Sequence, residues 1–103
     1  MNRATEDQPC RVVDAGKLPA EVGGADGLCS AIARAIEARG PSLEYAVEVR
    51  VISASRLSAT LVTGDGRRLP EKNFAIMDRN LNAASIQRFA EAIAGQLVEA
   101  GSR

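Results

Sequence analysis

The two cysteines of the chain, Cys10 and Cys29, are the residues whose spacing suggests a definite chemistry. Cys10 opens a short run of β-prone residues and Cys29 lies in the first turn of a predicted helix, so the thiols meet if that strand packs on that helix. A disulfide between them closes a loop of roughly 20 residues and stabilises the fold by about 3 kcal/mol on the chain-entropy model. Because the spacing is not Cys-x-x-Cys, a thioredoxin-like redox site is not expected. We predict a structural disulfide and an oxidising compartment; two free thiols are the alternative.

Histidine is absent from the sequence. This absence excludes Ser-His-Asp and Cys-His nucleophile arrangements and zinc sites that use histidine, and two cysteines cannot form a four-thiolate site. Four acidic residues remain as carboxylate candidates for catalysis: Glu44, Glu48, Glu71 and Asp78. Glu48 lies between valines on a predicted strand and pairs with Arg50 or a cross-strand neighbour, which favours a structural role. We therefore expect no catalytic residue, metal or cofactor; a carboxylate-dependent enzyme or small-ligand binder is an alternative.

Two loops contain residue types that bind ligands in other proteins. Residues 23–27 read Gly-Gly-Ala-Asp-Gly before a helix, where phosphate-binding loops occur, but they lack the Lys-Ser/Thr ending of the P-loop and Asp26 is itself negative. Asp78, Arg79 and Asn80 connect the last predicted strand to the last helix and are a candidate ligand loop. The same residue types are common in turns and helix caps. We predict capping in both loops.

Hydrophobic periodicity predicts a single domain over residues 10–101, after a flexible polar leader at residues 1–9. The expected elements are strands at 10–15, 45–53, 57–62 and 67–77 and helices at 27–39 and 83–100. Asp26 is the expected cap of the first helix, and Gly40 in a left-handed conformation followed by Pro41 is its expected end. Asn82 or Asn80 caps the second helix and Gly101 closes it. The last strand is broken near Pro70, after a tight hairpin at Asp65-Gly66.

This pattern predicts an α+β two-layer sandwich with the order β-α-β-β-β-α, a mainly antiparallel sheet and both helices on one face. In the strand at 45–53, Tyr45 and the three valines that alternate with charged residues face the helices. The opposite side is the predicted interaction face, with Glu48, Arg50, Ile52, Ser58, Thr60 and Val62. Ile52 and Val62 are expected there beside the polar residues, as an apolar spot with a polar rim.

From residue 26 onward, the order α-β-β-β-α resembles that of double-stranded RNA-binding domains. Those domains carry a lysine cluster at the start of the last helix. The stretch from Ala84 to Phe89 has a single basic residue, Arg88. The chain has 13 basic and 13 acidic residues, so its formal net charge is zero, whereas nucleic-acid binders usually have an excess of basic residues. Nucleic acid is therefore not expected as a partner. RNA binding is an alternative, which a basic patch of Arg50, Arg56, Arg67 and Arg68 would favour.

Elimination leaves a non-enzymatic accessory or protein-binding module of a bacterium, periplasmic or secreted, whose partner is another protein or a second copy of itself. Its mixed sheet face and its edge-prone first strand are both known routes to partners. Residues 1–8 are polar and contain no signal peptide, so a cytoplasmic location is the alternative. No apolar run approaches the ~18 residues of a membrane helix, so no membrane span is expected.

Overall fold

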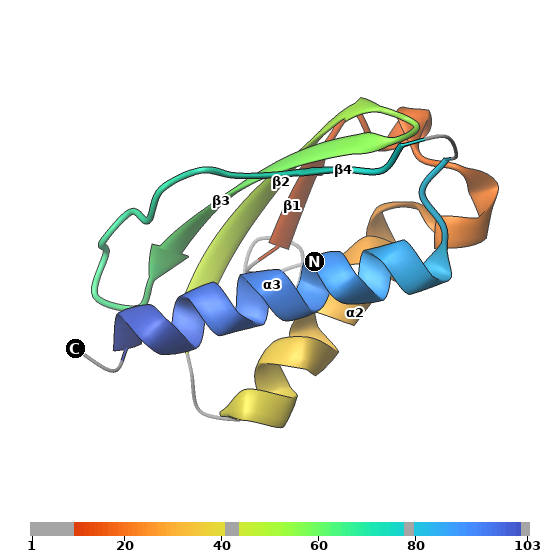
Figure 1. Cartoon of the computed structure of the whole chain (residues 1–103). Coiled ribbons are helices and arrows are strands. Elements are labelled where there is room, and N and C mark those ends of the chain that lie inside the picture. Colours follow the sequence, from red (N-terminus) through yellow and green to blue (C-terminus); the bar gives the residue numbers. More distant parts are fainter. Residues whose placement is uncertain (1–9, 41–43, 78–79, 102–103) are drawn as a thin grey trace, which may run out of the picture.

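The structure is a computed structural model that describes residues 10–40, 44–77 and 80–101. Its elements are β1 (Cys10–Val13), η1 (Ala15–Lys17), η2 (Ala20–Val22), α2 (Gly24–Arg39), β2 (Tyr45–Ser53), β3 (Arg56–Thr63), β4 (Lys72–Ala75) and α3 (Ala83–Gly101) (Figure 1). The predicted order is confirmed, and two single-turn 3-10 helices occupy the loop before α2. The predicted leader at residues 1–9 lies outside the described residues.

The four strands form one sheet in the order β1-β2-β3-β4. β1 runs parallel to β2, whereas β2, β3 and β4 are antiparallel to their neighbours. The parallel pair arises because α2 lies between β1 and β2 in the chain and returns it to the same end of the sheet. Both long helices lie on one face of the sheet and pack against each other (Figure 1). The predicted two-layer, mainly antiparallel architecture is confirmed.

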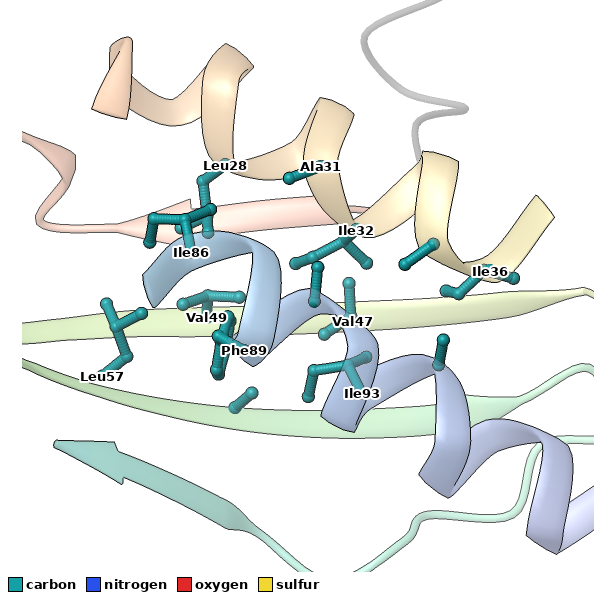
Figure 2. Packing of buried hydrophobic residues seen from close by; sticks show 14 of the residues in the cluster. Leu28, Ala31, Ile32, Ile36, Val47, Val49, Leu57, Ile86, Phe89 and Ile93 are labelled. Atoms are coloured by element: carbon teal, nitrogen blue, oxygen red, sulfur yellow. The ribbon is translucent and has the colours of Figure 1, made fainter. Parts of the chain in front are cut away.

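The core lies between the helices and the sheet, and its side chains come from both layers (Figure 2). Val49, Phe89 and Ile93 are completely buried, and Phe89 also contacts Phe74 with ring centroids 5.5 Å apart. Because side chains alternate along a strand, the burial of Val47, Val49 and Val51 leaves the residues between them on the opposite surface. The inward direction predicted for this strand is therefore confirmed.

A two-residue turn at Ala54 and Ser55 joins β2 to β3, and Ser53 pairs with Arg56 across it. Neither turn residue has a positive φ, so the turn is not one of the primed types that match the twist of a hairpin. The register instead shifts between Val51 and Ser53, which makes the intervening Ile52 the extra residue of a β-bulge. The bulge offsets the pair next to the turn, Ser53 and Arg56, from the register that the rest of β2 and β3 share.

The hairpin after β3 has a three-residue loop, with hydrogen bonds from Thr63 N to Arg67 O and from Gly66 N to Thr63 O, both 2.9 Å long. Gly66 adopts a φ of 89°, the positive φ predicted for this turn. The returning strand is broken, as predicted: Arg68 pairs with Val62 in an isolated bridge, and β4 begins only after Pro70. β4 has four residues, and Lys72 lies opposite buried Ala59, on the side of the sheet that the helices cover.

The ends of α2 differ from the prediction. The helix begins at Gly24, three residues earlier than expected, because Gly23 adopts a left-handed conformation and serves as the N-cap. Asp26 is thus in the first turn and makes no capping hydrogen bond. At the other end Gly40 is extended, with φ −173°, so the predicted left-handed cap is wrong; Pro41 lies outside the described residues.

The prediction for the start of α3 is confirmed at Asn82. The Oδ1 atom of Asn82 accepts a hydrogen bond from Ser85 N at 2.9 Å, and Ser85 Oγ accepts one from Asn82 N at 2.8 Å. These two reciprocal hydrogen bonds are arranged as in a capping box. They also provide the hydroxyl of buried Ser85 with a hydrogen-bond partner. At the other end, Gly101 is the last residue of α3, and the residues after it lie outside the described ranges.

Replacing Gly95 of α3 by Ala is expected to raise the melting temperature by a few degrees. A Cβ atom at Gly95 would lie 3.7 Å from Nη1 of Arg39, an ordinary contact distance, so alanine fits without a clash. The higher helix propensity of alanine then stabilises the fold by up to about 1 kcal/mol. Thermal unfolding followed by circular dichroism measures the change. The reverse substitution in the same helix, Ala92→Gly, is the control and should lower the melting temperature. A decrease in Gly95→Ala would contradict this packing of α2 on α3.

Candidate interaction face of the sheet

The surface of the sheet opposite the helices, here called the open face, carries every residue of the predicted interaction face. Within the described residues, no helix or strand covers it (Figure 1). Alternation with the buried strand residues, together with the strand pairings, assigns its members. They are Arg11, Val13, Ala46, Glu48, Arg50, Ile52, Arg56, Ser58, Thr60, Val62, Arg68, Glu71, Asn73 and Ala75.

The register arranges these residues in four rows across the strands. The first row is Ala46, Val62 and Arg68; the second is Arg11, Glu48 and Thr60, with Glu71 beside them; the third is Val13, Arg50, Ser58 and Asn73; the fourth is Ile52, Arg56 and Ala75. The charged residues of β2, Glu48 and Arg50, thus lie in the two middle rows. Apolar residues of β2 and β3 lie in the two end rows.

This register corrects the predicted apolar spot. Ile52 and Val62 share the open face, but Val62 pairs with Ala46 at one end of β2, while Ile52 lies in the bulge at the other end. Ile52 is six positions after Ala46, which is about 20 Å along a strand. Ile52 is 43% exposed and Val62 is half-buried, so the two form separate apolar sites.

Ser58 lies on the open face as predicted, but its side chain is buried there and only 5% exposed. Its hydroxyl donates a hydrogen bond to Oε2 of Glu71, the residue that directly precedes β4. The carboxylate thus covers Ser58 and fixes the start of β4 on β3. Glu71 was one of the carboxylate candidates in the sequence but was not assigned to this face.

Two small hollows lie side by side on the open face. The first has a volume of about 250 Å³ and is lined by Arg11, Ala46, Val47, Glu48, Thr60, Val62 and Arg68. The second has a volume of about 140 Å³ and is lined by Glu48, Arg50, Ser58, Thr60 and Glu71. Both are smaller than the roughly 300–1,000 Å³ of typical small-molecule sites. They are of a size to receive side chains of a partner surface.

Six charged side chains of the open face are exposed: Arg11, Glu48, Arg50, Arg56, Arg68 and Glu71. Among the described residues, the ion pair within 4.0 Å is that of Lys17 with Asp14, which lies elsewhere. The carboxylates and guanidinium groups of the open face therefore make no ion pair at that distance with any other described residue. Within the described part of the chain, a partner can engage these groups without breaking a salt bridge.

The predicted basic patch is divided by the fold. Arg50, Arg56 and Arg68 belong to the open face, but Arg67 donates a hydrogen bond through Nη2 to Ala100 O at 3.1 Å, at the end of α3. Arg67 also lines a separate hollow of about 380 Å³ between α3 and the segment around Pro70. Gln96 Nε2 donates to Pro70 O there at 3.0 Å, so the polar groups of this hollow already tie the helix to the sheet.

Of the carboxylate candidates, the structure brings Glu48 and Glu71 to one hollow, where Glu71 is engaged by Ser58. Glu44 precedes β2 and lies against Gly64 of the hairpin, and Asp78 lies outside the described residues. In the described part of the chain, no three His, Cys, Asp or Glu residues cluster as metal ligands. Among the described residues, the carboxylate candidates that the fold brings together on the open face are thus Glu48 and Glu71.

The pKa shifts that are resolved lie away from the open face. Burial, with a smaller contribution from Glu37, raises the pKa of Tyr45, whose side chain is half-buried on the helix side. In the hairpin loop, the hydroxyl of Thr63 donates to Asp65 and lowers the pKa of that carboxyl. Both shifts follow from local packing and turn structure.

The two candidate ligand loops have different outcomes. In the loop at 23–27, Gly27 N donates to Gly23 O at 3.2 Å, the first hydrogen bond of α2, so this backbone belongs to the helix start. Of the loop at 78–80, Asp78 and Arg79 lie outside the described residues, and Asn80 is exposed. The structure therefore brings no ligand group from the described part of either loop to the open face.

The predicted disulfide is present in the structure. The sulfur atoms of Cys10 and Cys29 are 2.05 Å apart, and the Cα atoms are 5.7 Å apart. The bond links β1, at one margin of the sheet, to α2 in the helix layer. It thereby fixes the strand that contributes Arg11 and Val13 to the open face.

None of the helices in the described ranges is long and apolar enough to span a membrane. Comparison of the chain with protein-family models, with curated proteins and with solved structures found no match.

Proposed function

We propose that this chain is a non-enzymatic protein-binding module and that its open face is the contact surface. The observation that carries the proposal is the one-sided architecture: two helices bury one face of the sheet, while the other presents six exposed charges among half-buried residues such as Thr60 and Val62. Surfaces that combine apolar residues with a polar rim are typical of protein contacts. The small volume of the hollows favours a protein surface over an enclosed substrate.

The proposed location is an oxidising compartment, the periplasm of a bacterium or the medium outside the cell. The support is the Cys10–Cys29 pair, because disulfides persist in such compartments and are rare in the cytosol. A module exposed to a reducing environment would lose this bond. The proposal therefore connects the location of the protein with the integrity of β1.

A photo-crosslinking amino acid at Asn73, an exposed residue at the rim of the open face, is expected to give covalent adducts with protein in living cells. The matched control is the same amino acid at Arg88, which is exposed on α3 in the helix layer. Adducts from Asn73 and none from Arg88 are the expected result. No adduct from Asn73, or equal adducts from both positions, would contradict the open face as the contact surface.

RNA binding is the second candidate, because four arginines and only two glutamates lie on the open face. Glu48 and Glu71 lie among these arginines and would repel a phosphate backbone, so we expect duplex RNA to bind no more tightly than about 10⁻⁶ M at physiological salt. A nanomolar complex with steep salt dependence would replace the proposed function by this one.

A further inference from the structure

We propose that the open face binds the open face of a second copy of this chain, so that two sheets pack face to face about a two-fold axis that runs across the strands. This inference rests on the proposed function and names the partner. It is drawn from the four rows of the open face, whose charges and apolar residues are arranged so that the surface complements itself.

The two middle rows provide the charge complementarity. Glu48 and Arg50 are two positions apart on β2 and therefore point to the same side, in adjacent rows. A two-fold axis midway between these rows exchanges them and leaves β2 over β2. Glu48 then faces Arg50 of the second copy, and Arg50 faces its Glu48. The same rotation places Thr60 over Ser58, so two opposite charge pairs form at the centre of an isologous contact.

The end rows are complementary under the same rotation. The axis exchanges the first row with the fourth, which brings Ile52 of one copy over Ala46 of the other, next to Val62. Because Ile52 and Val62 lie at opposite ends of the sheet, the rotation brings the isoleucine of one copy close to the valine of the other. Each 43% exposed isoleucine acquires an apolar contact at the far end of the second copy.

The alternative two-fold axis, parallel to the strands, gives a poorer match. It places β2 over β3, so that Glu48 comes to lie beside Glu48 of the second copy and Arg50 beside Arg50, about one strand spacing of 4.8 Å to the side. That arrangement gains a contact between Arg11 and Glu71 at the rim but sets like charges together at the centre. The axis across the strands is the one that the charges favour.

Arg56 and Arg68 decide between a second copy and an acidic partner. They give the open face two more positive than negative charges, which by itself would suit an acidic protein. In the proposed pair, Arg56 in the fourth row comes next to Arg68 of the second copy at the exposed rim, where the two repel. Replacing Arg56 by Glu therefore strengthens self-association if the inference is correct and weakens the binding of an acidic partner.

The first experiment is sedimentation equilibrium of the oxidised full chain. Glu48→Arg alone and Arg50→Glu alone are each expected to weaken self-association at least about tenfold, because each places like charges face to face. An equimolar mixture of the two variants restores it, since the first variant carries arginine at both positions and the second carries glutamate at both. The double variant on one chain also restores it. Arg88→Glu on α3 is the control and leaves association unchanged.

Melting curves of each variant establish that all are folded, which is expected because these side chains are exposed and make no ion pair with another described residue. A parent chain that stays monomeric up to about 1 mM, single variants that associate like the parent, or a mixture that does not recover would each overturn the inference. Weaker association in Arg56→Glu would overturn it as well. If the parent is monomeric while Asn73 crosslinks to a different protein, the proposed function stands and this inference alone fails; if Asn73 gives no adduct, both fail.

Discussion

Reduction of the Cys10–Cys29 disulfide is expected to lower the melting temperature by about 12–24 °C. The bond closes a loop between residues 19 positions apart, worth about 3 kcal/mol of chain entropy, and each kcal/mol corresponds to about 4–8 °C in a domain of this size. The effect is large because β1 pairs with β2 over only four residues, at one margin of the sheet. Without the disulfide, β1 is connected to α2 only through the chain segment that contains η1 and η2.

Calorimetry with and without a reductant measures the difference, and titration of thiols measures the redox state. The native oxidised protein should have no reactive thiol and should gain two on reduction. The control is the double variant Cys10→Ser/Cys29→Ser, which should melt at the lower temperature and should not respond to reductant. Two reactive thiols in the oxidised protein, or an unchanged melting temperature on reduction, would rule out the structural role of this bond.

Gly27→Ala is expected to destabilise the fold by on the order of 3 kcal/mol, because a Cβ atom at this position would overlap the carbonyl oxygen of Val22. Gly23, with φ 86°, turns the chain so that η2 folds back on the first turn of α2. The overlap is with backbone, which cannot rotate away as the end of a side chain can. The start of α2 or the end of η2 must move, and Val22 and Leu28, both buried, move with it.

Chemical unfolding with urea measures this loss, and Gly95→Ala is the matched control because the same substitution there meets only the end of Arg39. The two variants should change stability in opposite directions. Equal stability of Gly27→Ala and the parent would show that η2 does not pack on α2 as described, and would remove the explanation given for the early start of that helix.

The elements of this fold could be predicted from the sequence because their signals are local. Alternation from Tyr45 to Ser53 fixes which side chains of β2 face the helices, since side-chain direction changes with every residue. Asn82 could be identified as a cap for a similar reason, because its partner Ser85 is three residues away. Gly23 could not be identified as the N-cap, since a left-handed glycine gives no periodic signal before the helix starts.

The composition of the open face could be predicted only in part, because it depends on register. The bulge at Ile52 follows from a turn without positive φ, and nothing in the alternation of β2 indicates it. Arg11 joins the face through parallel pairing with Glu48, and Arg68 joins it through a single bridge to Val62. Such long-range pairings have no local sequence signal, and they decide which charges become neighbours.

The margin of the sheet at β4 has a consequence for growth of the sheet. An exposed edge can act as a template for strands of other molecules, and proteins oppose this with short edge strands, prolines and inward-pointing charges. β4 has four residues, Pro70 lies just before it, and Lys72 is directed to the side that the helices cover. An incoming strand would find few unpaired backbone N–H and C=O groups to bond with, and its addition would bury the Lys72 side chain. We therefore expect the β4 margin to resist the addition of a further strand, and so to oppose fibril growth from this side of the sheet.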